Sequence, residues 1–328
     1  MILAGDIGGT KTNLALYERV NGALTMKVQH QFASKEFATF HEVIAAFLRL
    51  TLPKSINAAC FGIAGPIVDG NCHTTNLPWH ISTNELKELL NTLHVSLLND
   101  LEATAYGMLY LPEDAFAELN PKANYVEANR AVIGAGTGLG EGMLFYDGQK
   151  YHPIASEGGH CDFAPLNAEQ DKLLVWLRNK YPLHVSYERI LSGPGIYALY
   201  TFLREDGFAQ EPLEMQNAGQ NIDKNALIGE CALKSNDPLC CKTLELFAEI
   251  YAAEASNLAL KTLSLGGVYI GGGIAPKILP FMRSNHFMRG FLSKGRFNGL
   301  LEKMPIKISL NAETALLGAA HFADDKLL

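Results

Sequence analysis

An acidic glycine turn ends the first apolar segment of the chain. Residues 3–13 read Leu-Ala-Gly-Asp-Ile-Gly-Gly-Thr-Lys-Thr-Asn. Counted from Gly5, this nearly matches the Walker phosphate loop, but Thr10 stands where the second glycine belongs. A Walker loop opens a helix, whereas residues 14–17 show neither a helical period nor a cap. The pattern therefore predicts a strand, a tight turn and a second strand.

A turn of this kind can bind phosphate without a helix, because successive backbone amides form an anion-binding nest. The carboxylate of Asp6 lies beside these amides in the sequence. Carboxylate oxygens are ligands that Mg²⁺ accepts while keeping several of its waters. We therefore expect Asp6 to hold a hydrated magnesium ion.

The same pattern occurs again 129 residues later. Residues 132–147 align with residues 3–18, so that Gly5 falls on Gly134 and Gly9 on Gly138, with apolar flanks in both copies. Such a repeat indicates a duplicated architecture. Two glycine hairpins in two halves could grip one polyphosphate from both sides of a cleft. Two ordinary hairpins with glycine turns remain the simpler alternative.

Composition excludes several classes of protein. A chain of 328 residues with 48% hydrophobic residues is comfortable as two domains. A net charge of −7 without basic runs argues against a nucleic-acid partner. The six cysteines show no C-x-x-C motif, which is typical of reduced thiols in the cytoplasm rather than of disulfides or a zinc site. Neither a signal peptide nor a membrane span is predicted.

The hydrophobic periodicity predicts alternating strands and helices. We expect Ser82 and Glu85 to form a capping box for a helix carrying Leu86, Leu89, Leu90 and Leu93. Residues 113–129 are polar and turn-rich and are expected to link the halves. Further elements are expected as follows: strands at 24–32, 56–63, 95–98 and 267–270, and helices at 37–48, from Pro238 to about 263, from near Pro276, and at 313–322.

The segment Leu97-Leu98-Asn99-Asp100 delivers an amide and a carboxylate at the end of an apolar strand. Ligands bind at this end of the strands in open α/β sheets. A carboxylate there can accept a proton from a substrate hydroxyl, a role that suits aspartate in phosphoryl transfer. A helix N-cap is the alternative, and the two roles are compatible.

Residues 157–162 read Glu-Gly-Gly-His-Cys-Asp. An acid and an imidazole separated by two glycines can close around a polyol, because both bind hydroxyl groups. His160 and Asp162 also have a spacing that could ligate a metal, but the companion ligands are missing. A structural turn is the remaining alternative.

Two more segments could contact a ligand. Glu188 could bind another hydroxyl, although a salt bridge to Arg189 or exposure to solvent explains it locally. The triplet Gly271-Gly272-Gly273 follows a strand, so its backbone can approach a flat purine closely. A plain strand-to-helix turn is the alternative there.

Seven motifs, in this order along the chain, resemble those of the bacterial glucokinase family. They are Gly5–Thr10, Thr75–Trp79, Leu98–Asp100, Gly134–Gly140, Glu157–His160 with Asp162–Pro165, Glu188–Gly195, and Gly271–Ile274. The resemblance implies an α/β, two-domain actin-like ATPase fold of the duplicated ribonuclease-H-like type, with a cleft between the lobes. We expect a small domain at 1–110 plus about 311–328, and a large domain at 111–310.

The resemblance also implies roles for individual residues. Asp100 would be the base toward the 6-hydroxyl of glucose, and Asn99, Glu157, His160 and Glu188 would hold the other hydroxyls. ATP would be bound by Gly5, Asp6, Ile7, Gly8, Gly9, Thr10, Gly136, Thr137, Gly138, Gly272 and Gly273. Asp6 would hold Mg²⁺, and family likeness suggests a homodimer.

The chain departs from the related ROK sugar kinases and repressors. They typically carry a cysteine-rich zinc loop after the histidine, where this chain has Asp162-Phe163-Ala164-Pro165, so zinc is not expected. A repressor would need a helix-turn-helix before the first hairpin, which begins at residue 2. The predicted reaction is phosphorylation of D-glucose at the 6-hydroxyl by MgATP, feeding glycolysis. A kinase for mannose or an N-acetylated amino sugar, a non-catalytic sugar sensor, and a nucleotide-driven chaperone or filament remain alternatives.

Overall fold

The computed structural model describes residues 1–74, 76–219 and 222–327. Thr75, in one of the motifs quoted above, and Leu328, at the end of the expected small domain, lie outside the described residues. The chain divides into two compact units. Unit 1 comprises residues 1–115, 151–155 and 311–328, and unit 2 comprises residues 116–150 and 156–310.

Unit 1 contains a five-stranded sheet of order β3-β2-β1-β4-β8. β1 pairs parallel with β4 and β4 with β8, whereas β2 pairs antiparallel with both β1 and β3. Its strands are β1 (Ile2–Ile7), β2 (Lys11–Val20), β3 (Ala23–Ala33), β4 (Ala58–Ile63) and β8 (His94–Asn99). A small second sheet joins β5 (Ile67–Val68), β6 (Asn71–His73) and β7 (His80–Ser82).

Helices cover both faces of the first sheet. Side chains of α1 (Phe40–Thr51) and α2 (Thr83–Leu90) pack with Leu3 and Ile7 on one face. Side chains of α3 (Asp100–Gly107) and α12 (Thr314–Asp325) pack with Ile2 and Ala4 on the other. Alternate residues of β1 therefore serve two separate cores, as the two-residue period of a strand requires. The 3₁₀ turns of this unit are η1 (Ser34–Glu36) and η2 (Glu113–Ala115).

The six-stranded sheet has the order β12-β11-β10-β13-β14-β9. Its strands are β9 (Phe116–Glu118), β10 (Arg130–Ala135), β11 (Leu139–Tyr146), β12 (Tyr151–Ser156), β13 (Val268–Gly271) and β14 (Ile306–Ser309). The first five strands of this order correspond one by one to the sheet of unit 1, and β10, β13 and β14 are parallel. The duplication predicted from the two glycine hairpins is therefore confirmed.

The paired strands do not keep the 129-residue offset along their whole length. Ile7 pairs with Thr12 across the first turn, and Ala135 pairs with Leu139 across the second. The first turn therefore comprises residues 8–11, and the second comprises only residues 136–138. A sequence alignment without gaps cannot show this difference, because a change in turn length requires a gap.

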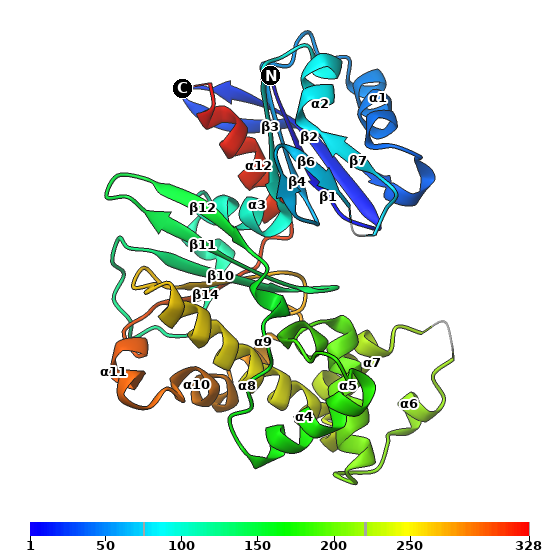
Figure 1. Ribbon diagram of the computed structural model, residues 1–328, viewed down its shortest axis with the longest axis vertical. Coiled ribbons are helices and arrows are strands. Elements are labelled where there is room, and N and C mark those ends of the chain that lie inside the picture. The colour runs from blue at the N-terminus through cyan, green and yellow to red at the C-terminus, as the bar shows by residue number, and fades with distance from the viewer. Residues whose placement is uncertain (75, 220–221, 328) are drawn as a thin grey trace. The chain divides into compact units, whose positions relative to one another are not determined.

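The long helix α8 (Pro238–Lys261) lies at the centre of unit 2 and contacts β10, α5 and α10 (Figure 1). The Asp237 side chain accepts a hydrogen bond from the N–H of Cys240, and Pro238 occupies the first turn, as predicted. The other elements are α4 (Ala168–Lys180), α5 (Gly193–Glu205), α6 (Leu213–Gln216), α7 (Lys224–Glu230), α9 (Leu279–Met282), α10 (Asn285–Leu292), α11 (Asn298–Leu301), η3 (Gly158–His160), η4 (Tyr187–Arg189), the π-turn η5 (Cys231–Ser235) and η6 (Gly295–Phe297).

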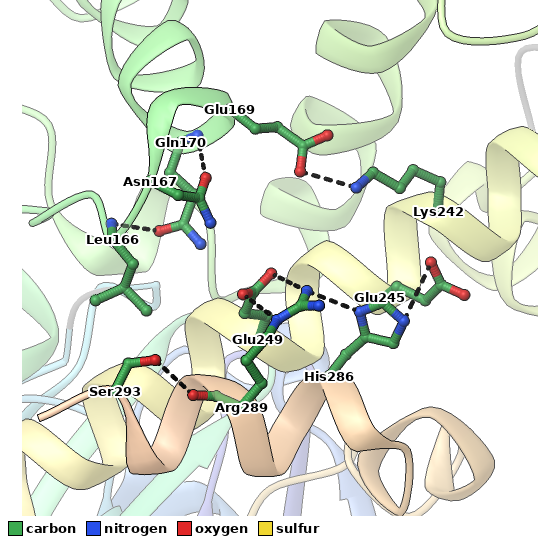
Figure 2. Close-up of polar contacts among 10 residues, drawn as sticks. All are labelled: Leu166, Asn167, Glu169, Gln170, Lys242, Glu245, Glu249, His286, Arg289 and Ser293. Atoms are coloured by element: carbon green, nitrogen blue, oxygen red, sulfur yellow. Dashed lines mark hydrogen bonds and ion pairs between the residues drawn. The ribbon is translucent and has the colours of Figure 1, made fainter.

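Polar side chains join α8 to α10 and α4 (Figure 2). Arg289 of α10 donates two hydrogen bonds, of 2.9 and 3.0 Å, to the buried carboxylate of Glu249 on α8. Lys242 of α8 donates to Glu169 of α4 at 2.8 Å. Both contacts connect residues far apart in the sequence and fix the helices around the core of unit 2.

Three details of the predicted elements are wrong. Ser82 occupies the N-cap position of α2, but its side chain makes no capping hydrogen bond. Leu93 lies outside α2, which carries Leu86, Leu89 and Leu90 but ends before the left-handed Asn91. The link expected at 113–129 contains β9, a strand too short to leave a periodic signal.

Candidate functional site

The first glycine turn connects β1 to β2, so a strand follows it and not a helix, as predicted. The N–H of Gly8 donates to the carbonyl of Lys11 at 3.0 Å. Ser34, fully buried, donates from its hydroxyl to the carbonyl of Gly8 and from its N–H to the carbonyl of Thr10. Sequence reasoning missed Ser34 because nothing in its own surroundings indicates a contact with a turn so far along the chain.

Close packing explains two of the glycines. A methyl group on Gly5 would lie 2.6 Å from the ring of Phe61, and one on Gly9 would lie 2.7 Å from Cβ of Asn76. Gly8 and Gly9 line a small depression together with Asn76 and other residues, namely Ile7, Ala64, Thr74 and Leu77. The backbone of the turn is therefore accessible at the surface of unit 1, where a phosphate could approach its amides.

Asp6 lies near the carboxyl end of β1, opposite Asn13 on one side and Gly62 on the other. Burial raises the pKa of its carboxyl, and a hydrogen bond from the Asn13 side chain partly offsets this effect. A desolvated carboxylate of this kind gains from a neighbouring cation. The Asp6 carboxylate would therefore fit a hydrated magnesium ion, which it would hold through the water molecules of the ion.

Asn99 and Asp100 mark the junction of β8 and α3. Oδ1 of Asn99 accepts from the N–H of Leu101, and the Glu102 carboxylate accepts from the N–H of Asn99, both at 2.9 Å. Oδ1 of Asp100 also accepts from Leu101 at 2.9 Å. The cap and the predicted carboxylate at the strand end are thus both present.

Asp6 and Asp100 share one edge of the sheet. Because β1, β4 and β8 are parallel, their carboxyl ends lie together. Ile7, Ile63 and Asn99 form one row across these strands. Two strand spacings separate the ends of β1 and β8, a distance of about 10 Å. Unit 1 therefore presents a candidate metal ligand and a candidate base at the same edge.

The second glycine turn joins β10 to β11. Gly136 donates from its N–H to the carbonyl of Gly138, and accepts from the N–H of Gly193, both at 2.8 Å. Gly193 is the first residue of α5. The hydroxyl of Tyr251 on α8 accepts from the N–H of Ala135 at 3.0 Å. Two helices thereby fix the turn that carries Gly136, Thr137 and Gly138.

Glu188 lies in η4 and contacts this second turn. Its Oε2 accepts a hydrogen bond from the N–H of Leu139 at 3.0 Å, and it leaves no room for a side chain at Gly138. The salt bridge to Arg189 suggested as its local explanation is wrong, since Arg189 lies over the ring of Tyr181. The local sequence around Glu188 is typical of an exposed side chain, but its carboxylate in fact lies beside the second glycine turn.

The loop with Glu157 and His160 packs on the same residue. A methyl group on Gly159 would lie 2.1 Å from the carbonyl oxygen of Leu139, so the loop backbone touches the start of β11. The side chains of Glu157 and His160 are exposed. Leu139 therefore contacts both Glu188 and the backbone of the loop that carries Glu157 and His160.

The spacing of His160 and Asp162 suggested a shared metal ion, but Asp162 has His184 as its partner. Its carboxylate lies 3.0 Å from Nε2 of His184, and both side chains are exposed. In the described part of the chain, no group of three or more His, Cys, Asp and Glu side chains could hold a metal ion.

The glycine triplet lies beside the second turn. Gly272 has φ of +78°, and a methyl group on it would lie 2.3 Å from the carbonyl oxygen of Ala135. The neighbouring Gly273 has open space around it. The helix expected from near Pro276 is wrong at its start, since α9 begins at Leu279. An accessible glycine backbone next to a phosphate-type turn suits a nucleotide.

Comparisons with known proteins point to one family. The family model described as Glucokinase matches residues 3–326. A glucokinase of Trichormus variabilis is 42% identical over 334 residues, covering 98% of each chain. The crystal structure of a glucokinase from an Antarctic psychrotroph is similar with a TM-score of 0.85 and 31% identity, covering 99% of this chain and 98% of the other.

A more distant structure shares the fold. It is a ROK family glucokinase from Streptomyces griseus in complex with glucose and AMPPNP, with a TM-score of 0.67 and 19% identity over 99% of both chains. Across the described residues, no helix is both long and apolar enough to cross a bilayer. The predicted two-domain actin-like ATPase fold is confirmed. From the family model and the relatives, the chain belongs to the glucokinase family, the ATP-dependent enzymes that phosphorylate glucose.

Proposed function

We propose that Asp100 is the general base of the glucose phosphorylation reaction. The observation that carries this proposal is its position at the carboxyl end of β8, at the same sheet edge as Asp6. The Asp100 carboxylate takes the proton of the sugar's 6-hydroxyl as that oxygen forms its bond to the γ-phosphorus. The bond between this phosphorus and the β,γ-bridging oxygen breaks, and ADP leaves with the electron pair.

The other hydroxyls of glucose are bound by Asn99, Glu157, His160 and Glu188 in this proposal. Carboxylates accept hydrogen bonds from sugar hydroxyls, and the amide and imidazole both donate and accept them. The contacts that Glu188 and the 157–160 loop make with Leu139 support a shared role for these residues. Loss of one charged acceptor should weaken sugar binding more than turnover.

ATP is bound through backbone in this proposal. The N–H groups of the two glycine turns, at Gly5–Thr10 and Gly136–Gly138, hold the phosphates, except those of Gly8 and Gly136, which bond within their own turns. Gly272 and Gly273 approach the adenosine. Asp6 holds Mg²⁺ through its waters. The ion would neutralise charge on the phosphate oxygens, while the turn amides are already oriented by Ser34 and Tyr251. The protein is also proposed to be a homodimer, which analytical ultracentrifugation tests. Its proposed location is the cytoplasm, which cell fractionation tests.

A panel of sugars tests the substrate. ADP release should be measured with glucose, mannose, N-acetylglucosamine and 6-deoxyglucose, and the product identified by NMR. We expect glucose to give the highest kcat/KM and glucose 6-phosphate as its product. 6-Deoxyglucose should inhibit competitively without accelerating ADP release, because it lacks the accepting hydroxyl. A preference for another hexose would replace glucose in the proposal, and sugar binding without ADP release would indicate a sensor.

A further inference from the structure

Two acidic side chains are buried behind the 157–160 loop and take no part in the reaction proposed above. Glu141 of β11 is 2% exposed and Glu254 of α8 is 0% exposed. Within the described residues, Oε1 of Glu141 has no hydrogen-bond partner, and Oε1 of Glu254 has no hydrogen bond but an ion pair with Lys261 at 3.6 Å. Burial of two carboxyl groups is costly unless they are paired or neutral.

The two carboxyl groups lie within hydrogen-bonding range of each other. A carboxylate only accepts hydrogen bonds, so a bond between two such groups requires a proton on one of them. Burial and the nearby Glu254 both raise the pKa of Glu141, and Lys261 only partly offsets them. The pair therefore carries one proton at neutral pH.

Glu141 touches the sugar loop directly. A methyl group on Gly158 would lie 2.2 Å from Oε2 of Glu141, so the carboxyl group lies against the backbone between Glu157 and Gly159. A shift of this carboxyl group would displace the residue that follows Glu157. One end of the pair therefore determines the position of a proposed sugar ligand.

Glu254 reaches the other proposed ligand through two side chains. Its Oε2 accepts from Nδ2 of Asn257 at 2.8 Å, and the same Nδ2 lies 3.2 Å from the hydroxyl of Tyr187. Tyr187 is buried and immediately precedes Glu188, and its N–H donates to the carbonyl of Cys161 at 3.0 Å. The pair is thus connected to both segments that carry the sugar ligands.

We propose that Glu141 and Glu254 form a positioning pair that shares one proton and holds Glu157 and Glu188 in their sugar-binding arrangement. This inference rests on the proposed roles of those two residues. When the shared proton is lost, two negative charges lie in buried contact and repel each other. The separation displaces Gly158 and Tyr187, and glucose binding weakens.

Several other charged or titratable groups face the pair. From α8, Tyr251 and Lys261 face Glu141, and Lys261 Nζ lies 3.6 Å from Oε1 of Glu254. From η4, Tyr187 faces both acids, and Lys294, before η6, faces Glu254. Burial raises the pKa of Tyr187 and Tyr251, so both stay neutral over the range in which the pair loses its proton.

The test compares the wild type with Glu141→Gln, which copies the protonated acid in shape. The KM for glucose and kcat are measured from pH 6 to 9. We expect the ratio of the wild-type KM to the Glu141→Gln KM to rise with pH. Above the pH at which the pair loses its shared proton, this ratio should rise roughly tenfold per pH unit. The ratio of the two kcat values should change little. Because the two proteins differ only at residue 141, the ratio isolates the effect of this residue.

Further variants separate the possible failures. Glu254→Gln should flatten the KM profile in the same way and serves as the test if Glu141→Gln does not fold. Glu141→Ala should raise KM at every pH, because it removes the group that supports Gly158. A KM ratio that stays constant with pH would overturn the positioning pair. If Glu157→Gln leaves the KM for glucose unchanged, the proposed function itself fails, whichever result the pair gives.

Discussion

The carboxylate of Glu188 accepts a hydrogen bond from the backbone N–H of Leu139, 3.0 Å away at the end of the second glycine turn. One hydrogen bond therefore joins a proposed sugar ligand to a proposed phosphate-binding turn. The packing of Gly159 on the carbonyl of Leu139 adds the 157–160 loop to the same point. The proposed sugar-binding and phosphate-binding segments of unit 2 thus meet at Leu139.

Replacement of Glu188 should separate its two roles. In Glu188→Gln the amide oxygen can still accept from Leu139, but the charged acceptor for the sugar is lost. We expect the KM for glucose to rise roughly 10- to 100-fold, since hydrogen bonds to charged groups contribute about 1.5–3 kcal/mol. Glu188→Ala should in addition lower the free energy of unfolding by about 1–3 kcal/mol, because Leu139 N–H loses its partner.

Steady-state kinetics and urea unfolding of both variants check this prediction. The matched control is Glu214→Gln, which removes a charge from an exposed position on α6 and should change neither quantity. Equal stability of the Gln and Ala variants would show that the bond to Leu139 does not hold the turn.

Gly318 should tolerate no side chain, since α12 packs closely on α3. A methyl group there would lie 1.8 Å from the carbonyl oxygen of Ala103, in the helix that begins with Asp100. We expect Gly318→Ala to lower the free energy of unfolding by roughly 2–3 kcal/mol, the upper range for overpacking. It should also reduce kcat, because a shift of α3 displaces Asp100, its first residue and the proposed base.

Gly229→Ala provides the control for the same chemical change. Gly229 lies in α7 with nothing within 4 Å of the added methyl group, so alanine should stabilise the protein by about 0.5–1 kcal/mol. Urea midpoints measured side by side give the comparison. Similar effects of the two substitutions would contradict the close packing of α3 and α12.

Arg289→Ala should destabilise unit 2 without affecting glucose binding. It leaves the carboxylate of Glu249, whose side chain is 5% exposed, without its two hydrogen bonds (Figure 2). Because the Arg289 side chain is 57% exposed, we expect a loss of about 1–3 kcal/mol, less than the 3–5 kcal/mol of a fully buried pair. Lys234→Ala, which breaks the exposed pair with Glu230, should cost no more than about 0.5 kcal/mol.

Thermal unfolding combined with the KM for glucose measures both parts of this prediction. A fall in glucose affinity at unchanged stability would indicate that Arg289 acts on the site and not on the packing of α8 and α10.

Asp6→Asn should affect stability and magnesium dependence in opposite directions. Since burial raises the pKa of Asp6, the folded protein binds its proton more tightly than the unfolded chain does. The ionised carboxylate therefore costs stability as pH rises from about 4 through the folded pKa. Without metal, Asp6→Asn should be more stable than wild type at pH 7.5, and this difference should shrink toward pH 5.

The same ionised carboxylate is what Mg²⁺ requires, so Asp6→Asn should need more Mg²⁺ for half-maximal activity. In the wild type, this requirement should increase as pH falls, because protons compete with the metal. Titration of activity with Mg²⁺ at two pH values measures it, with Asp114→Asn as a control in exposed η2. Identical magnesium curves for wild type and Asp6→Asn would exclude Asp6 as a ligand.

Local patterns predicted the elements that bear the site, but not the contacts between them. The turn after Ile7, the strand end at Asn99 and the cap at Asp237 depend on neighbouring residues, and all three are present. The bond from Leu139 to Glu188 and the support of Gly8 by Ser34 join residues 49 and 26 positions apart. No period or motif encodes such pairs, because they arise only when separate elements pack.

The errors have the same origin. Ser82 has the spacing of a capping residue, yet its side chain is buried at the end of β7, so tertiary packing overrides the local preference. Glu188 and Arg189 are adjacent opposite charges, yet each has a more distant partner. Glu141 gave no signal, since a single acid in an apolar strand resembles a surface residue until its neighbours are known.

The role of Asp100 is tested most directly by Asp100→Asn, which keeps an acceptor for Leu101 N–H but removes the base. kcat is measured with saturating glucose and MgATP, and glucose affinity is measured separately by calorimetry. We predict that kcat falls roughly 10²- to 10⁴-fold, the usual contribution of a general base, while glucose still binds with similar affinity. A kcat close to that of the wild type would contradict the assignment of Asp100 as the base.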